Sequence, residues 1–177
     1  LTRLLACRLL LRRVRVETDS MKILVTVEML KSKIRAVPDF PKEGVVFRDV
    51  TPLLGDPDLF RGAVSTLVTP FEDIDFVVSP EARGFIFGSA AALLLSAGFV
   101  PVRKSGKLPW RTCFRSYTLE YGQDTLEIHS DAIGQGDRVL IVDDVLATGG
   151  TARACVDLVH DLGGEVVGCS FLCELVG

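Results

Sequence analysis

The sequence predicts an α/β protein with an open, mostly parallel β-sheet, helices on both faces of the sheet, and a β-hairpin flap. Apolar segments of strand length alternate along the chain with segments of helical periodicity. The predicted strands are continuous apolar runs, as strands buried on both faces of a parallel sheet are. Residues 116–129 instead alternate polar and apolar side chains around Gly122 and Gln123, which is typical of a hairpin that stands off a sheet.

Length and composition are those of one globular domain. The 177 residues are enough for a full core, and 48% hydrophobic with 24% charged residues is ordinary for a folded protein. A formal net charge of −3 argues against nucleic acid as a partner. No segment is apolar for long enough to cross a membrane. Five cysteines without a CxxC pair or a Cys/His cluster predict reduced thiols in a cytoplasmic protein.

Residues 1–20 differ in composition from the rest of the chain. They contain five arginines and two acids, so the remainder is more acidic than the whole. Their apolar runs, Leu4 to Cys7 and Leu9 to Leu11, are too short for the core of a signal peptide, whereas an Arg-rich, acid-poor start is compatible with a transit peptide. We expect residues 1–20 to be a dispensable extension and residues 21–177 to form the single domain.

The N-terminal third is predicted to contain two helices separated by a loop. Thr26 can cap a helix that runs to Val37, where Pro38 stops it. A loop rich in proline and glycine, residues 39–57, follows and has a short extended centre. Asp56 then opens a second helix. Its apolar residues stand at helical spacing: Leu59, Phe60, Ala63, Val64, Leu67 and Val68.

The remaining elements repeat the order strand, helix, strand. Glycines close both predicted helices, because glycine adopts the left-handed conformation in which helices commonly end. In chain order we expect a strand at 74–78, a helix closed by Gly98, a strand from Phe99 into a basic loop, the hairpin, a strand with its core at 139–142, a helix at 151–162 closed by Gly163, and a last strand from Glu165.

The segment VLIVDDVLATGGTA, residues 139–152, places two acids at the end of a predicted strand and a run of small residues before a helix. Ligands of open parallel sheets bind at this end of the strands. The backbone N–H groups and positive dipole end of the helix would converge there on one phosphate. Since carboxylates repel a phosphate, Asp143 and Asp144 should face sugar hydroxyls or a metal ion, unless they merely cap the helix.

This segment resembles the phosphoribosyl-pyrophosphate motif of the type I phosphoribosyltransferases, whereas the P-loop and dinucleotide patterns are absent from it. Further segments resemble, in order, those of the adenine phosphoribosyltransferases, and the resemblance covers about residues 27–175. These segments are DFPKEGVVFRDVTPLL, EARGFIFG, VPVRKSGKLP, SYTLEYGQDTLEIHSDA and FLCEL. The resemblance implies the fold predicted above, with an N-terminal hood that covers the base.

The same resemblance implies a reaction and its partners. The phosphoribosyl group of phosphoribosyl pyrophosphate would pass to adenine, giving AMP and pyrophosphate in purine salvage. Mg²⁺ would be carried by the sugar donor rather than bound directly by protein ligands. The enzyme would be a cytoplasmic homodimer, with Arg103 and Lys104 near the place where the subunits meet.

The resemblance also assigns residues to the sugar donor. Asp143 and Asp144 would hold the ribose hydroxyls. The 5′-phosphate would be held by Ala147, Thr148, Gly149, Gly150 and Thr151. The pyrophosphate would be held by Arg83, Arg103, Lys104 and Lys107. Cationic side chains and a metal ion favour departure of so highly charged a leaving group.

On the side of the base, the resemblance assigns adenine binding to Val46, Phe47, Arg48 and Leu175. Val46 would act through its backbone and Leu175 by stacking on the base. Glu120 would be the catalytic acid–base group, with Tyr121 helping to close the site. Because family members usually continue beyond the point that corresponds to Gly177, we expect the chain to be truncated at its C-terminus.

Two other functions stay open at this stage. A non-catalytic regulator could keep the fold and sense phosphoribosyl pyrophosphate, but regulators of this kind carry a DNA-binding segment longer than residues 1–20. A phosphoribosyltransferase for guanine, xanthine or orotate would need different residues around the base.

Overall fold

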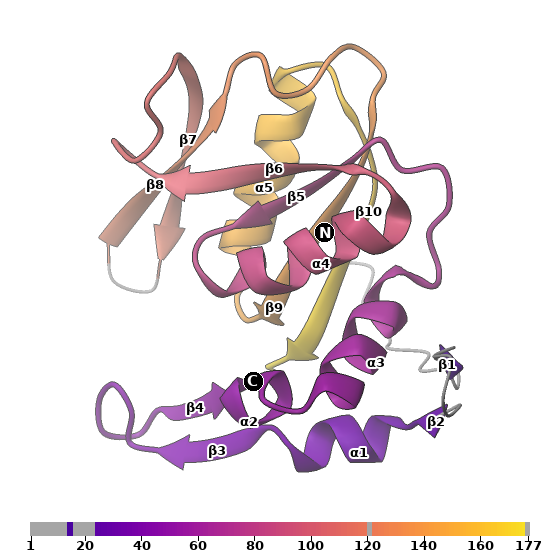
Figure 1. Ribbon diagram of the computed structural model, residues 1–177. Helices are drawn as coiled ribbons and strands as arrows, with labels where there is room; N and C mark the ends of the chain where they lie inside the picture. Colours follow the sequence, from indigo (N-terminus) through magenta and orange to yellow (C-terminus); the bar gives the residue numbers. More distant parts are fainter. Residues whose placement is uncertain (1–13, 16–23, 120–121, 176–177) are drawn as a thin grey trace, which may run out of the picture. The chain divides into compact units, whose positions relative to one another are not determined.

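A computed structural model describes residues 14–15, 24–119 and 122–175 of the chain (Figure 1). The chain divides into two compact units, with the boundary in the sequence between Thr66 and Leu67. Within the described residues, no helix is both long and apolar enough to span a membrane.

The first unit consists of short elements. Two antiparallel strand pairs, β1 with β2 and β3 with β4, accompany helices α1 and α2. In chain order the elements are β1 (Val14–Arg15), β2 (Leu24–Val25), α1 (Val27–Ser32), β3 (Arg35–Pro38), β4 (Val46–Asp49), α2 (Thr51–Leu54) and α3 (Pro57–Val68), which continues into the second unit.

Helix α1 confirms the predicted cap and corrects the predicted end. The Thr26 hydroxyl accepts a hydrogen bond from the Met29 N–H at 3.3 Å. The expected helix to Val37 is wrong, because α1 ends at Ser32 and Arg35–Pro38 form β3. Strand β3 pairs antiparallel with β4, and Val37 lies opposite Phe47. This pairing supplies backbone hydrogen bonds that the helical spacing of the apolar residues could not reveal.

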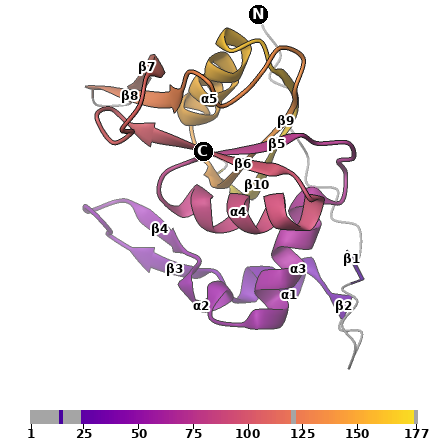
Figure 2. The same ribbon diagram turned by 45° about the horizontal axis from the view of Figure 1, so that its top comes forward.

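The second unit is built on a six-stranded sheet of order β10-β9-β5-β6-β8-β7. Strands β10, β9, β5 and β6 run parallel, while β8 and β7 form the predicted hairpin and are antiparallel. Helices α4 and α5 cover opposite faces (Figure 2). The bounds are β5 (Phe76–Pro80), α4 (Arg83–Leu95), β6 (Gly98–Lys104), β7 (Thr112–Leu119), β8 (Gly122–His129), β9 (Arg138–Leu146), α5 (Gly150–Asp161) and β10 (Glu165–Glu174). The predicted fold class is confirmed.

The central strands form the core, as their continuous apolar sequences predict. Val77 and Val78 of β5 and Leu140 and Ile141 of β9 are fully buried. Helix α4 packs closely on β5 at Gly88, where an added Cβ would lie 1.8 Å from the Ser79 Oγ. A small residue is therefore required at this point of closest approach between helix and sheet.

Two boundaries and the position of the hairpin differ from the expectations. Helix α4 is capped at Ser96 in the left-handed conformation (φ 56°), and Gly98 instead begins β6. Strand β9 continues beyond Val142 to Leu146. The hairpin does not stand off the sheet at its base, because β8 pairs with β6 through Arg103 opposite Glu127. The positions of Gly98, of Leu146 and of the hairpin base reflect pairing with strands that are distant in sequence.

Candidate active site

Three segments meet at the carboxyl ends of the adjacent parallel strands β9, β5 and β6. Glu81 and Arg83 follow β5, a basic loop of residues 103–107 lies at the end of β6, and residues 147–149 join β9 to α5. Arg83 contacts Asp144 of β9, and Glu81 contacts the basic loop. This is the edge at which open parallel sheets bind their ligands.

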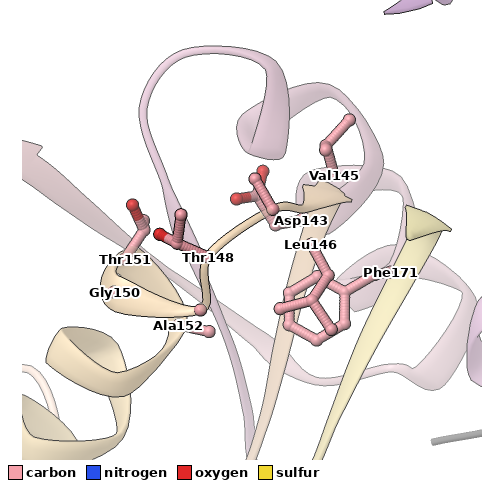
Figure 3. A pocket seen from close by; sticks show the side chains of 10 residues that line it. Asp143, Val145, Leu146, Thr148, Gly150, Thr151, Ala152 and Phe171 are labelled. Carbon is pink, nitrogen blue, oxygen red and sulfur yellow. The ribbon is translucent and has the colours of Figure 1, made fainter. Parts of the chain in front are cut away.

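A solvent-open pocket lies at the end of β9 (Figure 3). Gly149 precedes α5 with a φ of 83°, a left-handed conformation that favours glycine. Having no side chain, Gly149 leaves the first N–H groups of α5 without a side-chain cap, so they remain available to an anion. The pocket is lined by Asp143, Val145, Leu146, Ala147, Thr148, Gly149, Gly150, Thr151, Ala152 and Phe171. All five residues predicted to hold the 5′-phosphate are among them.

Asp143 is the acid that lines this pocket. Its Oδ1 accepts a hydrogen bond from the backbone N–H of Asp144 at 2.8 Å. Burial and the charge of Asp144 raise the pKa of the Asp143 carboxyl well above its usual range. The free protein therefore holds a carboxylate whose charged form is disfavoured until a ligand supplies hydrogen-bond donors or positive charge.

This raised pKa predicts a stability change in the variant Asp143→Asn. A carboxyl whose pKa is raised by folding lowers the free energy of unfolding when it is ionised. This destabilisation is absent below its unfolded pKa of about 3.9 and is complete above its folded pKa. The ligand-free variant should therefore melt at a higher temperature than the wild type at about pH 8, with the difference vanishing near pH 4. Calorimetric melting across this range tests it, and a variant that is less stable at about pH 8 would contradict it.

Asp144 has a different environment from Asp143. Its side chain is buried, and its Oδ2 lies 2.9 Å from the Arg83 Nε. Successive side chains of a strand point to opposite faces, so the two acids diverge. Asp144 is not among the residues that line the pocket. The structure thus brings Asp143 to the predicted phosphate cradle and pairs Asp144 with one of the predicted pyrophosphate residues.

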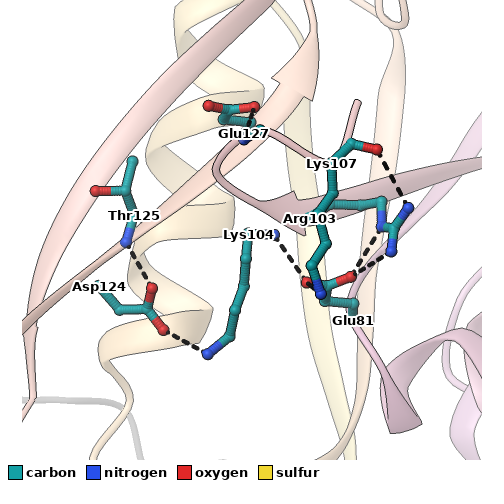
Figure 4. Close-up of polar contacts among 8 residues, drawn as sticks. Glu81, Arg103, Lys104, Lys107, Asp124, Thr125 and Glu127 are labelled. Carbon is teal, nitrogen blue, oxygen red and sulfur yellow. Dashed lines mark hydrogen bonds and ion pairs between the residues drawn. The ribbon is translucent and has the colours of Figure 1, made fainter. Parts of the chain in front are cut away.

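The basic loop is bound to acids that the sequence did not single out (Figure 4). The Arg103 Nε and Nη2 each donate to Glu81 Oε2 at 2.8 Å. The Lys107 Nζ lies 3.1 Å from Glu81 Oε1. The Lys104 Nζ lies 2.9 Å from Asp124 Oδ2 on β8. All four predicted pyrophosphate residues, Arg83 included, therefore form ion pairs with acids.

Glu81 is the most enclosed member of this cluster, since its side chain is 7% exposed. Burial alone would raise the pKa of its carboxyl, but hydrogen bonds from the Lys104 backbone and from the Arg103 and Lys107 side chains hold that pKa below its usual range. Glu81 is therefore an anion that fixes the basic loop to the end of β5.

The remaining predicted residues lie in three places. Leu175 follows β10, is 41% exposed, and donates its N–H to the carbonyl of the pocket residue Leu146 at 2.9 Å. Glu120 and Tyr121 lie outside the described residues. Val46, Phe47 and Arg48 lie on β4 of the first unit, where Val46 is exposed and the Phe47 ring packs edge-on against Phe40 at 5.2 Å.

Two aromatic residues at the site were missed by sequence reasoning. The Phe171 ring lines the pocket beside Leu146 and belongs to β10, in register with Asp143 (Figure 3). The Tyr117 hydroxyl of β7 accepts a hydrogen bond from the Thr151 hydroxyl at 3.4 Å. Strand register decides both placements, and register between distant strands leaves no local signal in the sequence.

Comparisons with known proteins agree with this geometry. The model of the phosphoribosyl transferase domain family matches residues 62–175. The adenine phosphoribosyltransferase of Methylobacterium nodulans is 58% identical over 152 residues, which are 85% of this chain and 84% of that protein.

Two crystal structures are also similar to the chain. That of adenine phosphoribosyltransferase from Rhodothermus marinus has 60% sequence identity and a TM-score of 0.81, covering 84% of this chain and 86% of that one. That from Saccharomyces cerevisiae, a complex with an imino-altritol bisphosphate and adenine, has 41% identity and a TM-score of 0.79, covering 84% and 88%. The sheet, the pocket after β9 and these similarities together show that the chain belongs to the adenine phosphoribosyltransferase family.

Proposed function

We propose that the chain transfers the phosphoribosyl group of phosphoribosyl pyrophosphate to adenine, giving AMP and pyrophosphate. A bond forms between a ring nitrogen of adenine and the anomeric carbon, the bond from that carbon to pyrophosphate breaks, and adenine loses a ring proton. The observation that carries the proposal is one pocket that combines Asp143 with the cradle of residues 147–151, at the sheet edge where the basic loop also lies, in a chain of this family.

The 5′-phosphate is proposed to bind the cradle of residues 147–151. The N–H groups at the start of α5 and the hydroxyls of Thr148 and Thr151 provide donors, and Gly149 lets the backbone approach the phosphate closely. Asp143 is proposed to accept hydrogen bonds from the ribose hydroxyls, as these donate well to a carboxylate. We extend this role to Asp144, with Arg83 beside it.

The pyrophosphate is proposed to bind Arg83 and the basic loop, where cations stabilise the negative charge that grows on the leaving group. We also propose that Mg²⁺ enters with the donor. The donor's phosphate oxygens rather than direct protein ligands would hold this ion, with the Asp143 carboxylate in the same pocket. When bound, this ion would neutralise part of the pyrophosphate charge.

Adenine is proposed to contact Val46, Phe47, Arg48 and Leu175. This proposal is supported by the resemblance of their segments to the family and by the adenine held in the yeast structure. Glu120 is proposed to take the proton that adenine loses, and Tyr121 to help close the site over a cationic sugar that water would otherwise capture. We further propose a cytoplasmic location.

Incubation of the purified chain with phosphoribosyl pyrophosphate, Mg²⁺ and one base at a time tests the reaction. We expect AMP and pyrophosphate to form with adenine, and no nucleotide to form with guanine, xanthine or orotate. Nucleotide formation from one of the other bases but not from adenine would overturn the assignment, and binding of the donor without any turnover would favour a regulator.

We propose that the chain forms a homodimer. The outer face of α4 supports this, because Ile86, Leu93 and Leu94 are 39%, 83% and 53% exposed. Apolar side chains gathered on one helix face are a common feature of subunit contacts. Light scattering should give twice the mass of one chain, and Leu93→Lys should shift the sample towards monomer. A stable monomer with full activity would contradict the proposal.

A further inference from the structure

The basic loop and its acidic partners are balanced in charge. Arg103, Lys104 and Lys107 supply three positive charges, and the carboxylates that contact the loop supply three negative ones. These carboxylates belong to Glu81, Asp124 and Glu127. An incoming pyrophosphate therefore meets cations that are already paired, and it gains a strong partner only where one of these ion pairs opens.

The backbone of the basic loop is held in place without Asp124. The Glu81 Oε1 accepts a hydrogen bond from the Lys104 N–H at 3.1 Å. Glu127 accepts from the Ser105 hydroxyl at 2.6 Å and from the Gly106 N–H at 3.2 Å. The Ser105 N–H donates to the Thr125 carbonyl at 3.2 Å. Loss of the contact between Asp124 and Lys104 would thus leave the loop anchored at both ends.

The ion pair between Lys104 and Asp124 is also the most exposed of the ion pairs that the basic loop forms. The Lys104 and Asp124 side chains are 56% and 20% exposed, whereas Glu81, which holds Arg103 and Lys107, is 7% exposed. When the Lys104–Asp124 ion pair opens, the carboxylate that loses its cation is partly exposed to water. The desolvation cost is therefore lower than for opening the ion pairs of the more deeply buried Glu81.

Asp124 has a hydrogen-bond donor besides Lys104. Its Oδ1 accepts a hydrogen bond from the Thr125 N–H at 2.9 Å, and Tyr117 lies opposite it on β7. Hydrogen bonding to Lys104 lowers the pKa of Asp124, and hydrogen bonding to Asp124 raises the pKa of Lys104. Both groups are therefore charged at neutral pH, and the lysine is the mobile partner because its four-carbon stem is flexible.

We propose that Asp124 is an internal counter-ion of Lys104 and that the pyrophosphate group displaces it from the lysine on binding. The inference rests on the proposed function, because it takes the pyrophosphate end of the donor as the ligand of the basic loop. Asp124 thereby sets how tightly this end binds. Its removal leaves Lys104 positively charged without an internal partner and eliminates a repulsive negative charge.

The test is calorimetric titration of the full chain with inorganic pyrophosphate and Mg²⁺ at low ionic strength. Asp124→Asn should bind pyrophosphate roughly 2- to 5-fold more tightly than the wild type, the range expected when an exposed ion pair no longer has to open. Asp131→Asn removes the same charge from an exposed position just after β8 and should leave the affinity unchanged. In a Lys104→Gln background, Asp124→Asn should have a much smaller effect.

Opposite outcomes are distinguishable. If Asp124 only positioned Lys104, Asp124→Asn would bind pyrophosphate more weakly than the wild type. Weaker binding or an unchanged affinity would overturn the proposed role of Asp124 as a counter-ion. Asp124→Glu retains the charge and should retain an affinity close to that of the wild type, which excludes a general disturbance of the hairpin. Formation of AMP by the wild type is measured separately. Failure of the wild type to form AMP would overturn the proposed function. Tighter binding of pyrophosphate by Asp124→Asn would still support the counter-ion role of Asp124.

Discussion

Phosphoribosyl pyrophosphate should bind to the double variant Asp143→Asn/Asp144→Asn at least roughly 100-fold more weakly than to the wild type. Each charge-assisted hydrogen bond between a carboxylate and a sugar hydroxyl contributes about 1.5–3 kcal/mol, so the loss of two corresponds to roughly 10²–10⁴-fold. Titration of each protein with the donor and Mg²⁺ measures the effect. An unchanged donor affinity would reduce the two acids to a structural role at the end of β9.

The single variants separate the two environments. Asp143→Asn keeps the ion pair between Arg83 and Asp144, so it should weaken donor binding without lowering stability. Asp144→Asn breaks that ion pair at a buried position and should lower both the melting temperature and the affinity for pyrophosphate. Equal losses of stability in the two variants would contradict this distinction.

Glu120→Gln should lower kcat by about 10²–10⁴-fold, in line with the contribution of a positioned acid–base group. The carboxylate is proposed to take the proton that adenine loses as its ring nitrogen attacks the anomeric carbon, and Gln cannot do so. Steady-state assays with adenine measure kcat and KM together. The expected loss is in kcat, because the amide retains the size of the side chain.

The control for this variant must lie away from the basic loop. Glu127, on the same hairpin, suggests itself from sequence as a neutral control, but it accepts hydrogen bonds from Ser105 and Gly106 of that loop. Asp131→Asn is a better match, since it removes a carboxylate from an exposed position. Similar small effects from Glu120→Gln and Asp131→Asn would remove Glu120 from the mechanism.

Local chemistry in the sequence was sufficient to predict several parts of the molecule. The placement of residues 147–151 around one pocket was predictable because a glycine-rich turn and the N-terminus of α5 are neighbours in the chain. The Thr26 cap and the continuous apolar strands β5 and β9 are likewise encoded within a few residues of where they act. The fold class follows from the order of such elements along the chain.

Contacts between distant segments decided the rest. The strand β3 replaced the end of a predicted helix because β4 offers it a pairing partner. The order β5-β6-β8 brings Glu81 and Asp124 to the same basic loop, although they are far apart in the sequence. The sequence by itself predicted which charged residues the proposed site would use. Only the tertiary structure decided which of them neutralise one another, because ion pairing depends on distances that strand order and register set.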